Sequence, residues 1–323
     1  MTTTNPTNHE AVCQDSRETT SGTNCTPKSS SATPIKKPVQ PAPQANVVVG
    51  IWSHQEAKQF AVSQLVSSGC GATAAMTVIR CLQPELQLTA DQVLQASILR
   101  KRAHTAPLLD YLVSRSCAGC TGEEVIESVR LLFTPEHGTQ LETHFFSCSK
   151  FVDSRHVKFQ KLFAPLPERD FELPTLGSPE PNFDHTDVIA WLKQKFETGH
   201  CLVATLNLQL FGNDAWHHQF VYAVDTLKRL VYCANPLTCY KEEVFKQLLC
   251  TPSVLVVRGE DVIKRNRAEA GDESVLAKPE WQKLDVKKQI SRCVEGTKPY
   301  ILIPACYKGG IAAFRLRQAP NAD

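Results

Sequence analysis

The sequence predicts an α+β fold in which an N-terminal helical half packs on a C-terminal antiparallel sheet. Helical periodicity and helix caps dominate the chain up to about residue 199, whereas short runs rich in Val, Leu, Ile and Tyr follow from residue 201. A doubly wound fold is disfavoured because helices and strands do not alternate. A chain of 323 residues with 42% hydrophobic residues can bury one large core or two modest ones.

The first element is an N-terminal tail. Residues 1–47 are rich in Thr, Ser, Asn, Pro and Gln and contain few large apolar residues, so burial cannot offset the entropy lost on ordering. We expect a disordered tail followed by one domain over residues 48–323. Residues 34–43, PIKKPVQPAP, have the spacing of a polyproline II segment that could dock into an aromatic groove; a plain linker is the alternative.

Helices are expected next, from apolar patterns and capping signals. The first has apolar residues on most faces, as a buried helix does, and two others begin at a Thr followed three residues later by Gln or Glu, which fits the capping box. The expected helices are Ala72–Leu82, two helices capped at Thr89 (with Gln92) and Thr121 (with Glu124), and Asp187–Glu197 closed by Gly199.

Strands are expected in the remaining part of the domain. Five runs rich in β-branched and aromatic residues are separated by turn residues: Cys201–Leu210, Gln219–Asp225, Arg229–Ala234, Ser253–Arg258 and Tyr300–Pro304. The proline-rich stretch 165–184 is expected to be an irregular surface loop, and Gly309 with Gly310 is expected to mark a turn.

Charge and composition exclude several classes of partner and site. The formal net charge of +2 gives no field that argues for nucleic acid or a membrane surface. The first ten residues contain no apolar core of a signal peptide, so we expect a soluble, cytoplasmic protein. Thirteen cysteines, an odd number at irregular spacing, are interpreted as cytosolic thiols rather than as a disulfide framework. No cofactor or metal is expected.

A candidate nucleophile lies at the start of the first helix. Cys70 stands in the segment SSGCGATAAM, where the unpaired backbone N–H groups and the dipole of a helix N-terminus stabilise a thiolate. The flanking Gly69 and Gly71 are interpreted as giving a substrate backbone access to the sulfur. Gln64, six residues earlier, is the candidate donor to an oxyanion, together with the Cys70 backbone N–H. A buried structural thiol is the alternative.

A candidate base lies at the start of a later strand. The segment WHHQFVYAVD places two adjacent histidines there, and only one of them can face the sulfur because successive side chains point to opposite faces. His218 shares a face with the apolar Phe220 and Tyr222, whereas His217 shares one with Gln219. His218 is therefore the expected base, and His217 a residue at the rim of the site.

The third member of the candidate site follows the next strand. Asn235, in an Asn-Pro pair, could accept a hydrogen bond from the His218 ring and so hold the tautomer that presents the other ring nitrogen to the sulfur. A simple Asn-Pro turn is the alternative.

Gln64, Cys70, His218 and Asn235 follow one another in the order found in papain-like cysteine peptidases of the C39-like group, which this chain resembles over about residues 48–306. In that group a Cys at a helix start, a His opening a strand and an Asn or Asp after the next strand form the triad. The resemblance implies a papain-like fold and acyl transfer through a thioester.

The segments SSGCGATAAMTVIRCL and WHHQFVYAVD resemble, more narrowly, the actin maturation protease family. Those cytosolic enzymes remove the acetylated N-terminal residue of immature actin. The resemblance implies a thiol aminopeptidase with actin as its substrate and no cofactor. That family also has a proline-rich N-terminal tail thought to bind profilin, which implies profilin as a partner for residues 34–43.

Other readings of the sequence remain open. A transglutaminase-like or deubiquitinating hydrolase shares the Cys-then-His order, and an inactive peptidase fold could serve as an actin or profilin binding module. Cys117 and Cys120 could be a redox pair or half a zinc site, but the second close pair of ligands is absent. The basic run 100–104 could attract an acidic peptide, and a solvated helix end is the simpler reading.

Overall fold

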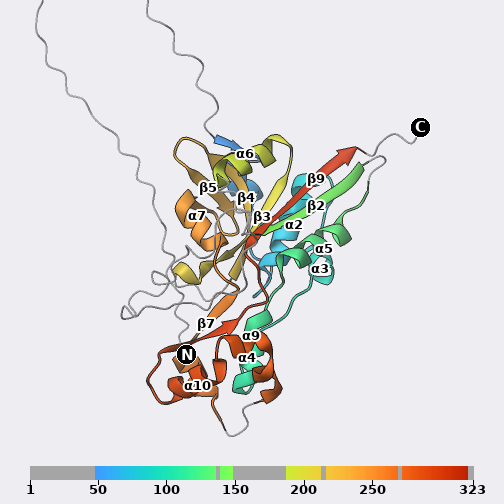
Figure 1. The fold of residues 1–323 in the computed structure, drawn as a ribbon. Helices are drawn as coiled ribbons and strands as arrows, with labels where there is room; N and C mark the ends of the chain where they lie inside the picture. Colours follow the sequence, from blue (N-terminus) through green and yellow to red (C-terminus); the bar gives the residue numbers. More distant parts are fainter. Residues whose placement is uncertain (1–47, 136–138, 148–186, 212–215, 268–270, 319–323) are drawn as a thin grey trace, which may run out of the picture. The chain divides into compact units, whose positions relative to one another are not determined.

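The computed structural model describes residues 48–135, 139–147, 187–211, 216–267 and 271–318, with only the backbone described for 210, 211 and 318 (Figure 1). All of them belong to one compact unit, Ala45–Asp323. The expected tail 1–47, its proline-containing stretch 34–43 and the expected loop 165–184 lie outside the described residues. Within the described part the fold is α+β, with antiparallel sheets, as the sequence predicts.

The larger sheet has seven strands in the order β2-β9-β3-β4-β5-β6, with β1 added beside β4, and every pairing is antiparallel. Its strands are β1 Val48–Gly50, β2 Thr139–Ser147, β3 Cys201–Asn207, β4 Trp216–Asp225, β5 Leu230–Ala234, β6 Thr238–Lys241 and β9 Gly310–Gln318. Strand β4 is central, since it pairs with β1, β3 and β5.

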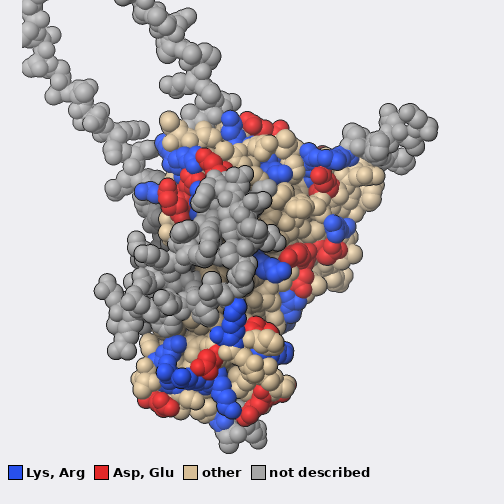
Figure 2. Space-filling view, in the orientation of Figure 1, with Lys and Arg blue, Asp and Glu red and all other residues tan. Residues whose placement is uncertain are grey.

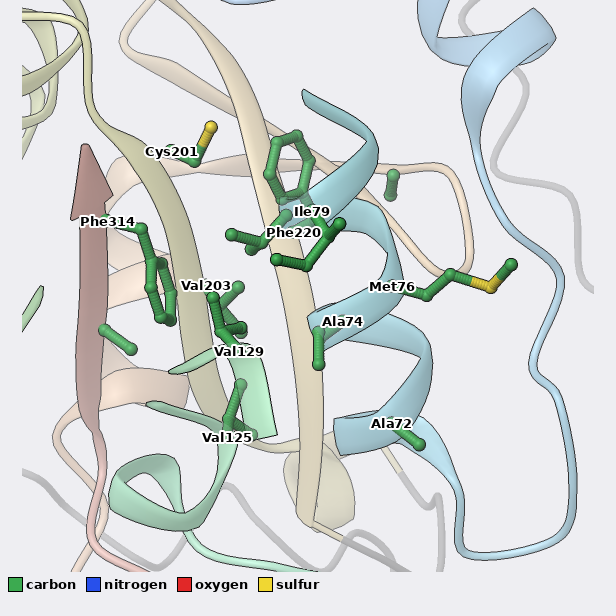
Figure 3. Packing of buried hydrophobic residues seen from close by; sticks show 14 of the residues in the cluster. Ala72, Ala74, Met76, Ile79, Val125, Val129, Cys201, Val203, Phe220 and Phe314 are labelled. Carbon is green, nitrogen blue, oxygen red and sulfur yellow. The ribbon is translucent and has the colours of Figure 1, made fainter. Parts of the chain in front are cut away.

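Helices cover both faces of this sheet (Figure 1). On one face lie α1 His54–Phe60, α2 Cys70–Leu82, α3 Ala90–Gln95 and α5 Gly122–Leu132; on the other lie α6 Val188–Glu197 and α7 Glu242–Leu249. Adjacent residues of β3 therefore enter different cores. Val203 packs with α2 and α5, as Figure 3 shows, whereas Leu202 packs with α6 and α7. Burial on both faces explains why β3 is buried along its whole length.

A smaller hairpin has its own helices and core. Strands β7 Val254–Arg258 and β8 Tyr300–Pro304 pair antiparallel beside α4 Leu108–Cys117, α8 Gly259–Arg265, α9 Pro279–Lys283 and α10 Val286–Val294. Trp216, the first residue of β4, is buried in this third core and its indole N–H donates to the Val254 carbonyl at 3.1 Å. The strand with the two histidines therefore begins where the larger sheet meets the hairpin.

Several predicted elements are confirmed, and others were missed. Capping boxes are present at Thr89 and Thr121, and all five expected runs form strands, although the end of the first run, 208–210, belongs to a 3-10 helix. The expected order, helices first and strands second, is wrong in part: β1 and β2 precede α6, and α7 to α10 follow β6. The turn expected at Gly310 is instead the start of β9, where a Cβ atom would stand 2.5 Å from the Phe146 carbonyl oxygen, so the neighbouring strand requires glycine.

The surface of the described part has mixed charge. On the face drawn in Figure 2, Lys and Arg side chains are interspersed with Asp and Glu, in keeping with the small formal net charge of +2. None of the helices in the described ranges is both long and apolar enough to cross a membrane.

Candidate active site

Cys70 is the first residue of α2 and is 8% exposed. Gly69 caps the helix without a side-chain hydrogen bond, so the N–H groups of the first turn remain directed out of the helix end. The neighbouring glycines serve packing within the protein, which differs from the access role expected for them. A Cβ atom at Gly69 would lie 2.7 Å from a Val66 methyl, and one at Gly71 would lie 1.9 Å from the Cys120 sulfur.

The imidazole that meets the Cys70 thiol is that of His217. The two side chains share a hydrogen bond, and the His217 Nε2 lies 2.7 Å from the main-chain oxygen of Asn235, to which it donates. Because Nε2 is used in this way, Nδ1 is the ring nitrogen left for the sulfur. This is the relation of nucleophile and base that acyl-transfer enzymes require.

The surroundings favour a thiolate and imidazolium pair. Burial raises the pKa of the Cys70 thiol, but the hydrogen bond and charge of His217 and the backbone N–H groups of His218 and Gly71 together hold that pKa below its ordinary value. Burial lowers the pKa of His217, but the hydrogen bond and charge of Cys70 and the bond to Asn235 raise it above its ordinary value. The two shifts run in opposite directions, as in an activated thiol.

His218, the base expected from the sequence, lies elsewhere, and this expectation is corrected. It is 2% exposed, and its two ring nitrogens lie 3.0 Å from the Thr205 hydroxyl and 2.9 Å from the Cys120 carbonyl oxygen. Burial, foremost, lowers its pKa to about 4. With both nitrogens occupied and the ring neutral, its side chain cannot accept a proton from the sulfur. His218 contributes through its backbone N–H.

The strand register pointed to the wrong histidine because Gln219 is not at the surface. It is fully buried, its amide oxygen accepts from the Tyr240 hydroxyl at 2.9 Å, and its Nε2 donates to the Thr238 hydroxyl at 3.3 Å. A satisfied polar group can lie in a core, so a polar neighbour did not identify the exposed face of the strand.

Asn235 belongs to the site through its main chain, which also differs from the expectation. Its carbonyl oxygen, and not its side-chain amide, accepts the histidine bond, and the histidine is His217. The residue has φ 68°, in the left-handed region that Asn tolerates better than most side chains. Its Nδ2 is buried and has no hydrogen-bond partner in the described part of the chain.

Gln64, the expected oxyanion donor, is exposed and donates from its side-chain amide to the Val66 carbonyl at 2.9 Å. It therefore stands in the loop that leads into α2, with one amide hydrogen used within that loop. Its part in stabilising an oxyanion stays a prediction.

A loop beneath the site was missed by the sequence analysis. The main chain of Gly119 pairs with that of Arg100 in a two-way bridge, and the Arg100 side chain donates to the Cys117 carbonyl at 2.6 Å and to both carboxylate oxygens of Glu124. This clamp fixes the carbonyl of Cys120 that binds His218. Burial, then the charges of Cys70 and Glu124, raises the pKa of Cys120, so it stays a neutral thiol.

The basic run 100–104 therefore contains an internal structural residue, Arg100, rather than only a solvated helix end. In the described ranges, no group of three His, Cys, Asp or Glu side chains could hold a metal ion.

No protein-family model matches this sequence, and no curated protein matches it at a significant level.

Proposed function

We propose that this protein is a cysteine peptidase of papain-like fold in which Cys70 is the nucleophile and His217 the base. One observation supports this above the others: a buried thiol at a helix N-terminus shares a hydrogen bond with an imidazole whose other nitrogen is held by a carbonyl. The inactive binding module is disfavoured, because a fold that only binds a partner does not require a thiol of lowered pKa beside a histidine of raised pKa.

The proposed reaction is acyl transfer in two halves. The Cys70 thiolate attacks the scissile carbonyl carbon, and the oxyanion is stabilised by the Cys70 backbone N–H and the Gln64 amide. The His217 imidazolium gives its proton to the leaving amine as the C–N bond breaks and a thioester forms. Water then attacks the thioester while His217 takes its proton, which releases the carboxylic acid and restores the thiolate.

The proposed substrate is immature actin, from which one acetylated N-terminal residue is removed in the cytoplasm, with profilin as a partner for residues 34–43. The support is the resemblance of the segments around Cys70 and His217 to the actin maturation protease family. In this chain, as in that family, the segment with the nucleophile precedes the segment with the histidines.

Intact-mass measurement of acetylated, immature actin before and after incubation with the purified protein tests the proposal. A loss equal to one acetylated residue is expected with the wild type and none with Cys70→Ala, which substitutes a small side chain at a helix end. Binding of actin without a mass change would favour the binding module. No mass change and no binding would remove actin as the substrate.

A further inference from the structure

Tyr307 lies between β8 and β9, beside the candidate active site, and is 7% exposed. Its ring stacks on that of Trp216, with centroids 5.9 Å apart and planes at 20°. Trp216 directly precedes His217 in β4, so the same strand that positions the proposed base also fixes the tyrosine ring.

The hydroxyl of Tyr307 points toward the start of α2. A side chain added at Gly119 would stand 3.4 Å from the Ser68 carbonyl oxygen and 3.8 Å from the Tyr307 hydroxyl. Ser68 is two residues before Cys70, and the Gly119 main chain is itself fixed by the bridge to Arg100. The hydroxyl thus lies at a rigid corner next to the nucleophile.

This hydroxyl has no hydrogen-bond partner in the described part of the chain, although the ring around it is buried. Burial, and after it the neighbouring thiol groups of Cys306, Cys70 and Cys120, raises the pKa of Tyr307, so the phenol keeps its proton throughout the working range of a peptidase. A protonated phenol without a protein partner is a donor available to a ligand.

A substrate cleaved after an acylated first residue has two carbonyl groups on the acyl side of the scissile bond. In the proposed mechanism, the Cys70 N–H and the Gln64 amide donate to the oxygen of the attacked carbonyl. The second carbonyl is that of the N-acyl group. Resting on the proposed function, we infer that Tyr307 determines specificity for an acyl-blocked N-terminus: its hydroxyl donates to the N-acyl carbonyl, and the stacked Trp216 and Tyr307 rings bound the acyl side of the site.

A free N-terminus would fit this corner poorly. An ammonium group has no acyl oxygen to accept from the phenol, and moving its charge from water against two buried aromatic rings is unfavourable. The neutral acetyl amide meets neither cost.

The test compares two synthetic peptides with the N-terminal sequence of immature actin, one acetylated and one with a free amine. For the acetylated peptide, Tyr307→Phe should lower kcat/KM by roughly 10- to 100-fold, the effect of losing one hydrogen bond in a buried site. For the free-amine peptide kcat/KM should change less than about threefold. Tyr300→Phe, a half-buried tyrosine at the start of β8, is the matched control and should resemble wild type on both.

The rate at which iodoacetamide alkylates Cys70 separates the possible failures, since alkylation forms no oxyanion and needs no acyl group. It should be equal in wild type and Tyr307→Phe. Equal loss on both peptides, or no loss on either, would overturn the role of Tyr307 while leaving the peptidase proposal intact. Wild type that alkylates readily but cleaves neither peptide nor acetylated actin would overturn the proposed function, and this inference with it.

Discussion

The His217 ring is held by the main chain of Asn235 and not by its side chain, through a bond of 2.7 Å from Nε2 to the carbonyl oxygen. The residue type at 235 therefore matters for the left-handed backbone conformation, with φ 68°, more than for any group on the side chain. A backbone carbonyl therefore orients the proposed base, and the side-chain amide of Asn235 is not needed for that orientation.

Asn235→Gly should accordingly keep most of the activity. Glycine adopts positive φ without strain and retains the carbonyl, so we expect kcat to fall less than about tenfold, whereas His217→Ala should lower it by about three orders of magnitude or more. Steady-state kinetics on acetylated actin peptide measures both. If Asn235→Gly is as inactive as His217→Ala, the side-chain amide orients the ring after all.

The pH dependence of Cys70 alkylation should show the ion pair directly. The pKa of Cys70 is lowered and that of His217 is raised, so each group favours the charged form of the other; protonation of the thiolate opposes the ion pair on the acid side, and deprotonation of the imidazolium opposes it on the alkaline side. In wild type, alkylation by iodoacetamide should persist well below the pH at which an ordinary thiol reacts.

In His217→Ala the hydrogen bond and charge are lost while burial remains, so the acid limb should move to higher pH. His144→Ala, at an exposed histidine of β2, is the control and should leave the profile unchanged. An unshifted profile in His217→Ala would show that another group lowers the pKa of Cys70.

Acid should destabilise the fold through His218. Its folded-state pKa, about 4, lies below the ordinary value of 6.5, mainly because the ring is buried. The unfolded chain therefore takes up this proton first, and the stability that His218 contributes is complete above pH 6.5 and is lost as the pH falls toward 4. The linked loss is about 3 kcal/mol.

Urea unfolding between pH 7.5 and 4.5 measures that loss. His218→Gln should be less stable at pH 7.5, because the bonds to Thr205 and Cys120 change, but its stability should fall less steeply with acid. The exposed His144→Gln should follow wild type. Parallel curves for wild type and His218→Gln would contradict a buried, neutral His218.

Gly71 and Cys120 should be energetically coupled. A methyl group at position 71 would overlap the Cys120 sulfur, so Gly71→Ala should cost about 2 kcal/mol of unfolding free energy. In a Cys120→Ala background the same substitution should cost clearly less, since the obstructing sulfur is gone. Cys117→Ala is the matched background, because the Cys117 thiol donates to Val113 instead, and it should give no relief. Equal costs in all three backgrounds would contradict the packing.

Local signals in the sequence predicted much of the fold. The capping boxes at Thr89 and Thr121 are formed by hydrogen bonds within four residues, and strand β3 is marked by a continuous apolar run. Neither signal depends on distant parts of the chain. Strands β2 and β9 were missed because charged residues interrupt them. Glu142 and Arg315 form an ion pair across these strands at 2.6 Å, a partnership that cannot be seen before the strands are paired.

Part of the candidate site could likewise be predicted from short segments of sequence, and part could not. The helix start at Cys70 and the importance of the histidine pair are readable from short segments. The choice between the histidines depends on which side chain finds partners in the interior. Those of His218 are Thr205, on the paired strand β3, and Cys120, 98 residues away. Tyr307 gave no signal at all, since only its stacking on Trp216 brings it beside the nucleophile.

The separation of Cys70 and His217 along the chain has a consequence for biosynthesis. The thiol acquires its partner only when β4 has been translated and has joined β3 and β5 over the face covered by α2. Until then a nascent chain that already contains Cys70 lacks the His217 imidazole and the His218 N–H that lower the pKa of this thiol. The full activation of Cys70 is therefore expected only after β4 has been translated and has taken its place in the sheet.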